Sequence, residues 1–385
     1  MRVQMRSTIR LGKVFGIEIG FNWSLLFVFA LVSWSLAATV LPRDVPNQSA
    51  AAYWITAVIG AVVFYGCLLA HELAHSVVAR RNGVKVSEIT LWLFGGVSKL
   101  AGEPRSAGVE ALITVVGPLS SIAIAVVAFG LAFVVSAAGA PALVSDLLVW
   151  LAVLNLGLGI FNLIPAFPLD GGRLLSSLFW WRYGSRQRGV HAAVQIGRIF
   201  AFLMIAIGAL ELFRGDGFNG IWLAFIGWFL LSAGGAEEAS TVTKALLESV
   251  PVSAAMTSPV VTVADGLTVD QFLASEAVHH HFTTYPLRDA AGELIGVVRL
   301  KDIVREASRG GHDRNLRDLA VPMSQMPMTQ PQEELETVLE RVGSDLDRRV
   351  LVMDDGKLVG ILSPTDVARI VTVRQALTTR AGATA

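Results

Sequence analysis

Long apolar stretches separated by short polar segments fill roughly the first 235 residues of the chain. Each of six stretches approaches the length of about 20 residues that a helix needs to cross a bilayer. We therefore predict six membrane-spanning helices, at residues 21–40, 54–78, 109–136, 147–165, 192–212 and 221–233. The fourth ends where Pro165 and Pro168 interrupt the apolar run.

Residues 86–100, between the second and third stretches, follow a different pattern. They are rich in β-branched and aromatic side chains, with Gly95 and Gly96 in their second half, and they are too few to span a bilayer as a helix. The pattern predicts a strand or hairpin that dips toward the membrane. Such a backbone is tolerated only where protein or a water-filled cavity covers it.

After Ser240 short strands and amphipathic helices alternate, and two segments resemble each other. Each opens on a methionine-containing turn and closes on an apolar strand followed by an aspartate, Asp302 or Asp366. A tandem repeat predicts a pseudo-symmetric pair of packed domains. The fold class is thus a polytopic α-helical membrane protein with an α/β module, divided into a membrane domain (1–236), a linker (237–250), two repeat domains (251–308 and 316–373) and a tail (374–385).

Composition supports a membrane protein, since 53% of residues are hydrophobic, only 16% are charged and the mean hydropathy is +0.58. The formal net charge is zero, which gives no bulk attraction to nucleic acid and excludes it as a partner class. The single cysteine, Cys67, excludes an internal disulfide. No short apolar segment with a cleavage site follows the basic N-terminus, so we expect it to be retained.

Lysine and arginine gather on one side of the predicted spans, in the segments before span one, between spans two and three, and between spans four and five. The opposite loops carry little more than Arg43 and Arg214. Because cytoplasmic loops carry the excess of positive charge, both termini are expected in the cytoplasm of a multi-pass cell-membrane protein. The same rule directs the C-terminal end of span two toward the cytoplasm.

That end of span two carries His71, Glu72 and His75. Residues four apart share one helix face, so both imidazoles can reach one zinc ion. Glu72, about 100° around the helix, can take a proton from water and return it to the leaving amine. The alternative is a polar turn at a helix end, but each ionisable side chain at membrane depth costs roughly 2.5–3.5 kcal/mol.

A two-histidine site needs a third protein ligand, and Asp170 follows the broken end of span four on the same side of the membrane. The alternative role for Asp170 is to cap the following short helix. Asn162 either donates a hydrogen bond to a developing oxyanion or satisfies carbonyls freed near the prolines. Cys67, one turn before His71, either approaches the metal or is a small buried hydrophobe.

The paired motifs His71-Glu72-Leu73-Ala74-His75 and Asn162-x-x-Pro-x-x-Pro-Leu-Asp170-Gly resemble the site-two protease family of intramembrane zinc metalloproteases over about residues 10–235. The resemblance implies one zinc ion per chain, held by His71, His75 and Asp170, with Glu72 as the catalytic base. It also implies regulated intramembrane proteolysis of single-pass substrates in a lipid bilayer. Gly95 and Gly96 match a strand of that family beside the active site, whose edge can hold an unwound substrate by β-augmentation.

The repeat domains resemble a tandem pair of cystathionine-β-synthase (CBS) domains, which implies an ATP- or AMP-type ligand and a homodimer. The second copy keeps the family's nucleotide-binding stretch as Gly360-x-x-Ser363-x-Thr365-Asp366. The first copy departs from it, with Arg299 where serine or threonine is expected. The alternative is that these domains only dimerise.

Two rival functions follow from the same residues. One is a transporter or channel gated by the CBS pair, which predicts polar ion-binding residues over several spans and tolerance of Glu72→Gln. The other is a membrane zinc protease that acts on soluble peptides, which requires a wide cavity open to the cytoplasm.

Overall fold

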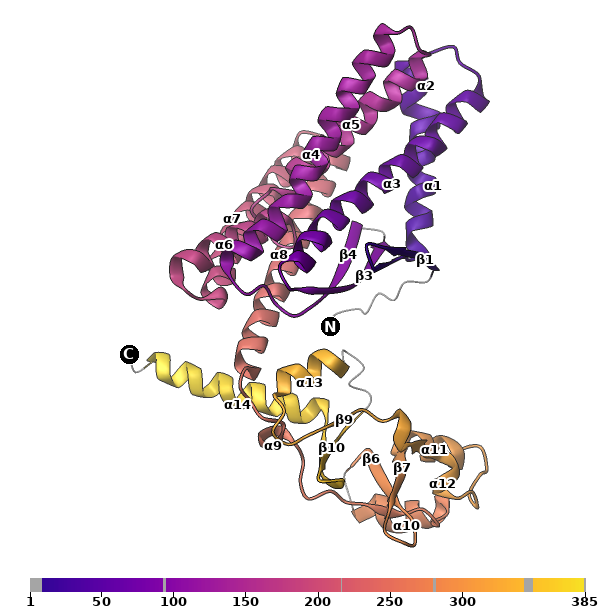
Figure 1. Ribbon diagram of the computed structural model, residues 1–385, viewed down its shortest axis with the longest axis vertical. Coiled ribbons are helices and arrows are strands. Elements are labelled where there is room, and N and C mark those ends of the chain that lie inside the picture. The colour runs from indigo at the N-terminus through magenta and orange to yellow at the C-terminus, as the bar shows by residue number, and fades with distance from the viewer. Residues whose placement is uncertain (1–8, 93–94, 216, 280–281, 343–348, 384–385) are drawn as a thin grey trace. The chain divides into compact units, whose positions relative to one another are not determined.

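The computed structural model describes residues 9–92, 95–215, 217–279, 282–342 and 349–383. The chain divides into two compact units between Val242 and Thr243. The first unit is built from long helices and one sheet, and the second from short strands and helices (Figure 1).

Six helical segments of the described chain are long and apolar enough to cross a membrane, and each contains or overlaps one of the predicted stretches. Their large apolar side chains are widely exposed, as in Phe27, Val62, Phe133 and Phe202, which suits contact with lipid. The helices of this part are α1 (Ser24–Ser35), the π-helix η1 (Leu36–Val40), α2 (Leu41–Asp44), α3 (Ala50–Arg81), α4 (Ala107–Ala137), α5 (Ala142–Asn162), α6 (Asp170–Tyr183), α7 (Arg186–Phe213) and α8 (Gly217–Leu247).

The sheet of the first unit has the order β1-β2-β3-β4, so β4 is an edge strand within the described residues. Its strands are β1 (Ile9–Val14), β2 (Ile17–Phe21), β3 (Lys85–Trp92) and β4 (Gly95–Ala101). β3 and β4 pair antiparallel over the segment 86–100, where the pattern predicts a strand or hairpin, whereas the hydropathy pattern does not predict β1 and β2. The parallel pairing of β2 with β3 joins the N-terminal hairpin to it.

One face of this sheet packs against α3 and α4. Ile17 and Ile89 are fully buried in a cluster with Leu68 of α3 and Ile113 of α4. Because burial of such side chains contributes about 1.5–3 kcal/mol each, the cluster fixes the sheet against the helices that carry the candidate site.

The second unit contains two interlocked repeats, with the sheets β5-β6-β7-β8 and β9-β10-β11. β8, from the second repeat, pairs with β7 of the first, and Thr257 of the first repeat bridges to Ile361 of the second. The elements are α9 (Val252–Ala255), β5 (Val263–Ala264), α10 (Val269–His279), β6 (Thr284–Arg288), β7 (Leu294–Arg299), α11 (Leu300–Ala307), α12 (Leu316–Leu319), β8 (Val321–Pro322), the 3-10 helix η2 (Met323–Gln325), β9 (Met328–Thr329), α13 (Leu335–Val342), β10 (Val350–Asp354), β11 (Lys357–Leu362) and α14 (Pro364–Ala383).

The two segments expected to flank the repeats are largely helical. The predicted linker at 237–250 continues α8 as far as Leu247, and Leu247 and Val250 are buried in a core of the second unit. The predicted tail at 374–385 is helical as far as Ala383, as the end of α14.

Candidate metal centre

Two imidazoles and one carboxylate converge in the first unit. His71 and His75 lie one turn apart on α3, with their Nε2 atoms 3.2 Å apart. Asp170, at the start of α6, brings its Oδ2 within 3.4 Å of the His71 Nε2 and 3.3 Å of the His75 Nε2. Two segments about 100 residues apart in sequence thus bring three side chains together, with their ligand atoms directed to one point.

The other ring nitrogen of each histidine faces α4. His71 Nδ1 is 2.9 Å from the hydroxyl of Ser121, and His75 Nδ1 donates to the carbonyl of Ile113 at 2.6 Å. A carbonyl can only accept a hydrogen bond, so the Ile113 carbonyl fixes the proton of His75 on Nδ1. The Nε2 atom then has a free lone pair. Both rings are therefore oriented with Nε2 toward Asp170.

The backbone around Asp170 depends on two glycines. A Cβ on Gly171 would lie 2.3 Å from the carbonyl oxygens of Leu163 and Ile164, and one on Gly172 would lie 2.6 Å from Ala166. Leu169 is the N-cap of α6, and the helix has no side-chain cap hydrogen bond. The alternative role of Asp170 as a helix cap is therefore wrong, and its carboxylate turns toward the histidines instead.

Glu72 lies beside the edge strand of the sheet. A Cβ on Gly96 of β4 would lie 2.3 Å from the Glu72 Cγ and 2.8 Å from Oε1. The backbone of β4 and the Glu72 carboxylate are thus in direct contact. A peptide that pairs with this edge strand would therefore lie beside the Glu72 carboxylate.

Asn162 and Cys67 lie outside the converging group. Asn162, the last residue of α5, donates from its amide to the carbonyl of Leu158 at 3.0 Å. Leu158 lies one turn back in the same helix, and its carbonyl is not one that the prolines free, so both roles considered for Asn162 stay predictions. Cys67 is half-buried and is not part of the only metal-binding group found among the described residues.

The donor set fits zinc. Catalytic zinc sites use three nitrogen or oxygen ligands and keep one position for water or substrate. Tetrahedral bonds of about 2.0–2.1 Å place the ligand atoms roughly 3.3–3.4 Å apart. The three separations here are 3.2, 3.3 and 3.4 Å, and the side chains of His71 and Asp170 are 4% and 18% exposed.

Comparison with known proteins agrees with this chemistry. Residues 59–141 and 136–204 match peptidase family M50, and the chain is 31% identical over 373 residues to the zinc metalloprotease MJ0392 of Methanocaldococcus jannaschii, covering 96% of this chain and 97% of that one. The chain belongs to peptidase family M50. It is an integral membrane metalloendopeptidase of the site-two protease type, and the family is a zinc family.

Other M50 relatives match over similar lengths. Rip3 of Mycobacterium tuberculosis is 40% identical over 370 residues, which cover 96% of this chain and 94% of Rip3. The solved site-2 protease from Methanocaldococcus jannaschii is 29% identical, with a TM-score of 0.40, over 60% of this chain and 94% of its own.

The second unit of this M50 protein carries two CBS domains, matched at residues 252–309 and 316–373. In the second copy, Ser363 and Asp366 form a capping box at the start of α14, because the Ser363 hydroxyl and backbone amide both donate to Asp366 Oδ2, at 2.5 and 2.9 Å. Thr257, from the first copy, donates to Asp366 Oδ1 at 2.9 Å. The exposed Thr365 lies 2.8 Å from the Ser363 hydroxyl.

The corresponding aspartate of the first copy has a different environment. Arg299 Nε donates to Asp302 Oδ2 at 2.6 Å, and Arg305 approaches its other oxygen at 3.3 Å. Thr257 of the first repeat pairs with Ile361 in the closing strand of the second, and Val321 of the second repeat pairs with Val297 in the closing strand of the first. Val321 is therefore the counterpart of Thr257, and it has no hydroxyl. The first copy thus lacks both hydroxyl groups found around Asp366.

The sequence did not indicate which residues contact the imidazoles of His71 and His75. Ser121, the carbonyl of Ile113, and Gly117 all lie on α4, an apolar span that contributes no side chain to the group of His71, His75 and Asp170. The dipeptide Gly117-Pro118 within that span was the signal available, because glycine in a membrane helix marks close packing.

Proposed function

We propose that this M50 protein is an intramembrane protease in which His71, His75 and Asp170 hold one zinc ion. The observation that carries the proposal is the match between the three ligand-atom separations and the edge of a zinc tetrahedron. The fixed orientation of both rings by Ser121 and Ile113 supports it, since metal-ligating histidines use their second nitrogen in this way.

Glu72 is the proposed general base and acid. Zinc, when bound, supplies a Lewis acid that polarises the peptide carbonyl and lowers the pKa of water. Glu72 takes the proton of the attacking water, carries it to the leaving amine, and is kept beside the scissile bond by its contact with Gly96. Asn162 assists by donating a hydrogen bond to the oxyanion after it leaves the Leu158 carbonyl.

The proposed substrate is a single-pass membrane protein whose helix unwinds before cleavage. A helix hides its carbonyls in internal hydrogen bonds, so attack requires an extended segment. β4 is an edge strand in the described sheet, and its backbone touches Glu72. A substrate strand added to β4 by β-augmentation would therefore bring its backbone to the base.

The proposed orientation follows from charge. Arginine and lysine side chains precede α1, follow α3 and precede α7, so these ends face the cytoplasm of a cell membrane, as do both termini. The site at the end of α3 then opens on the cytoplasmic side. The β3–β4 hairpin is proposed to dip toward the membrane there, covered by α3 and α4.

The CBS pair is proposed to bind one ATP- or AMP-type nucleotide through Ser363, Thr365 and Asp366, and to mediate a homodimer. Thr257 supports this site, because it presents a hydroxyl to Asp366 from the opposite repeat. In the first copy Arg299 forms an ion pair with Asp302, which supports a single nucleotide site in the second copy. We assign the membrane protease domain to 1–236, the linker to 237–250, the CBS domains to 251–308 and 316–373, and the tail to 374–385.

The test is metal analysis together with cleavage of a single-pass test substrate in liposomes. Glu72→Gln should keep one zinc per chain and lose cleavage by at least about 100-fold, the contribution of a general base. Glu211→Gln, which removes a surface ion pair with Arg214, is the matched control and should cleave normally. Zinc-free wild-type protein with an intact fold, or full activity of Glu72→Gln, would overturn the proposal.

A further inference from the structure

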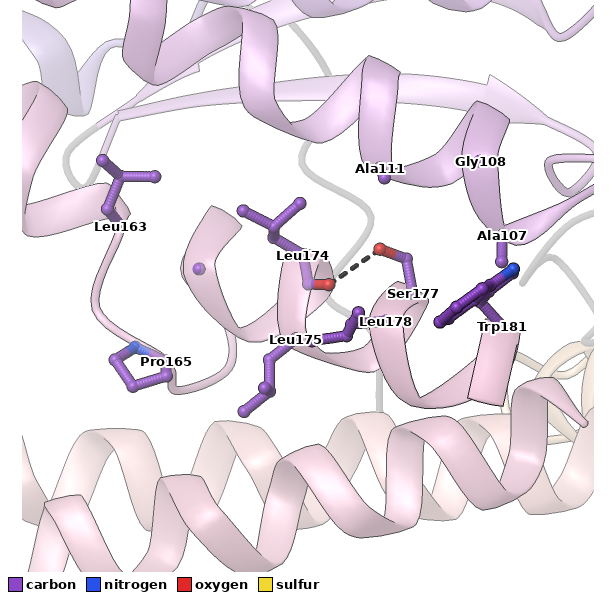
Figure 2. Close-up of a pocket in the computed structure, with 11 residues that line it drawn as sticks. Ala107, Gly108, Ala111, Leu163, Pro165, Leu174, Leu175, Ser177, Leu178 and Trp181 are labelled. Carbon is purple, nitrogen blue, oxygen red and sulfur yellow. Dashed lines mark hydrogen bonds between the residues drawn. The ribbon is translucent and has the colours of Figure 1, made fainter. Parts of the chain in front are cut away.

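An apolar pocket of about 460 Å³ lies between the first turns of α4 and the length of α6 (Figure 2). The lining side chains are aliphatic or aromatic except for one hydroxyl, that of Ser177, which donates to the carbonyl of Leu174 and is thereby satisfied. Its lining includes Ala107, Gly108 and Ala111 of α4 and Leu174, Leu178 and Trp181 of α6. Nothing charged lines it, so a polar ligand would find no partner there.

One end of the pocket adjoins the candidate metal centre. Gly171 lines the pocket and directly follows Asp170. From Gly171 to Trp181 the helix advances about 15 Å, at about 1.5 Å per residue. The pocket therefore runs along α6 from Gly171, the neighbour of Asp170, to the exposed Trp181, of which 75% is accessible.

The edge strand leads toward the same pocket. β4 begins at Gly95, beside Glu72, and its end at Ala101 is joined by a short segment to Ala107 and Gly108 in the pocket wall. A peptide paired with β4 would start beside Glu72 and continue along a strand that ends close in sequence to this wall. Over about 15 Å an extended peptide has roughly four to five residues, at about 3.3 Å each.

We propose that the pocket is a specificity pocket, which takes one large apolar side chain of the substrate within about four residues of the scissile bond. The inference rests on the proposed protease function and adds the chemistry that selects the cleavage site. The side chains of an unwound transmembrane segment are apolar and match a pocket without charges. The direct bond of Gly171, in the pocket wall, to Asp170 favours the substrate over a lipid acyl chain as the occupant.

Gly108 gives a clean way to fill the pocket. A Cβ on Gly108 meets no atom within 4 Å, so Gly108→Leu adds a side chain to the pocket wall without a backbone clash. Gly130, on the same helix, is equally open and exposed but distant in sequence from the pocket residues, which makes Gly130→Leu the matched control. Ala111→Leu fills the pocket from the next turn and serves as a second variant.

The experiment compares full-length wild-type protein and these variants on test substrates that carry leucine or alanine at each position flanking the cleavage site. In wild type and Gly130→Leu, leucine at one position should raise kcat/KM at least about tenfold over alanine. In Gly108→Leu and Ala111→Leu that ratio should fall toward one, with zinc content unchanged.

The possible failures are distinguishable. A wild-type protein that lacks zinc or cleaves none of the substrates would overturn the proposed function and this inference with it. Cleavage with the same leucine-to-alanine ratio in all variants would overturn the pocket alone. If rates instead follow the acyl-chain length of the liposome lipids and not the substrate side chain, the pocket binds lipid and the inference is wrong.

Discussion

Gly117 of α4 lies directly against the imidazole of His75, where an added Cβ would be only 2.1 Å from Nε2. One turn earlier, the Ile113 carbonyl of the same helix accepts from Nδ1 of that ring. α4 thus holds the imidazole from two positions, and only a residue without a side chain allows this approach.

Replacement of Gly117 should therefore remove the metal site. In Gly117→Ala the new methyl group and Nε2 cannot share the same space, so His75 must rotate or α4 must move away. We expect zinc content to fall well below one per chain while circular dichroism still reports the helices. Gly130→Ala, where a Cβ meets nothing, should retain its zinc. Full zinc occupancy in Gly117→Ala would contradict this packing.

Loss of the hydroxyl that faces His71 should weaken zinc binding without preventing it. Ser121 is fully buried and lies 2.9 Å from Nδ1, so Ser121→Ala leaves that ring nitrogen without its partner. Substitutions of this kind cost about 10–100-fold in metal affinity, which competition with a chelator would measure. Ser145→Ala removes an exposed hydroxyl bound to its own helix and should leave the affinity unchanged. An unchanged affinity in Ser121→Ala would mean that Ser121 does not orient the ring.

The three converging side chains could be predicted from the sequence because their signals are local. A spacing of four puts His71 and His75 on one helix face, and the membrane depth of Asp170 follows from hydropathy and charge. Gly117 and Ser121 could not be assigned in this way, since their roles arise from the packing of α4 on α3. No periodicity within one helix encodes which residue meets a ring on another.

The sheet illustrates the same limit. β3 and β4 are neighbouring antiparallel strands, and β-branched side chains indicate them locally. β2 pairs with β3 in parallel, although α1 and α3 separate the two strands in sequence. The short segment Ile17–Phe21 has no sequence pattern that indicates this long-range pairing. β2 directly precedes the first predicted span, and its apolar side chains do not by themselves indicate a strand.

Gly96→Ala should separate catalysis from metal binding. The added methyl group would overlap the Cγ of Glu72, and either the base or β4 would have to shift. Since His71, His75 and Asp170 are untouched, zinc content should stay at one per chain while cleavage falls at least about 100-fold, by analogy with loss of the base. Gly157→Ala, at an open position on α5, is the control for both measurements. Loss of zinc in Gly96→Ala would show that β4 supports the metal ligands as well.

The CBS pair should bind one nucleotide per chain, and Thr257 offers a way to test this without disturbing the fold of α14. Thr257→Val keeps the capping box of Ser363 and Asp366 but removes the hydroxyl that faces Asp366 from the other repeat. Without this bond Asp366 is no longer held in place for the nucleotide, so the affinity for AMP or ATP should fall, as measured by titration calorimetry of the full-length protein.

Two further variants define the stoichiometry. Thr372→Val removes a hydroxyl that bonds only within α14 and should bind one nucleotide like the wild type. Arg299→Ser combined with Val321→Thr frees Asp302 from its ion pair with Arg299 and restores both hydroxyl groups found around Asp366, so it should raise the stoichiometry toward two. Two nucleotides per wild-type chain would contradict the role of Arg299, and no heat of binding in any variant would leave dimerisation as the function of the pair.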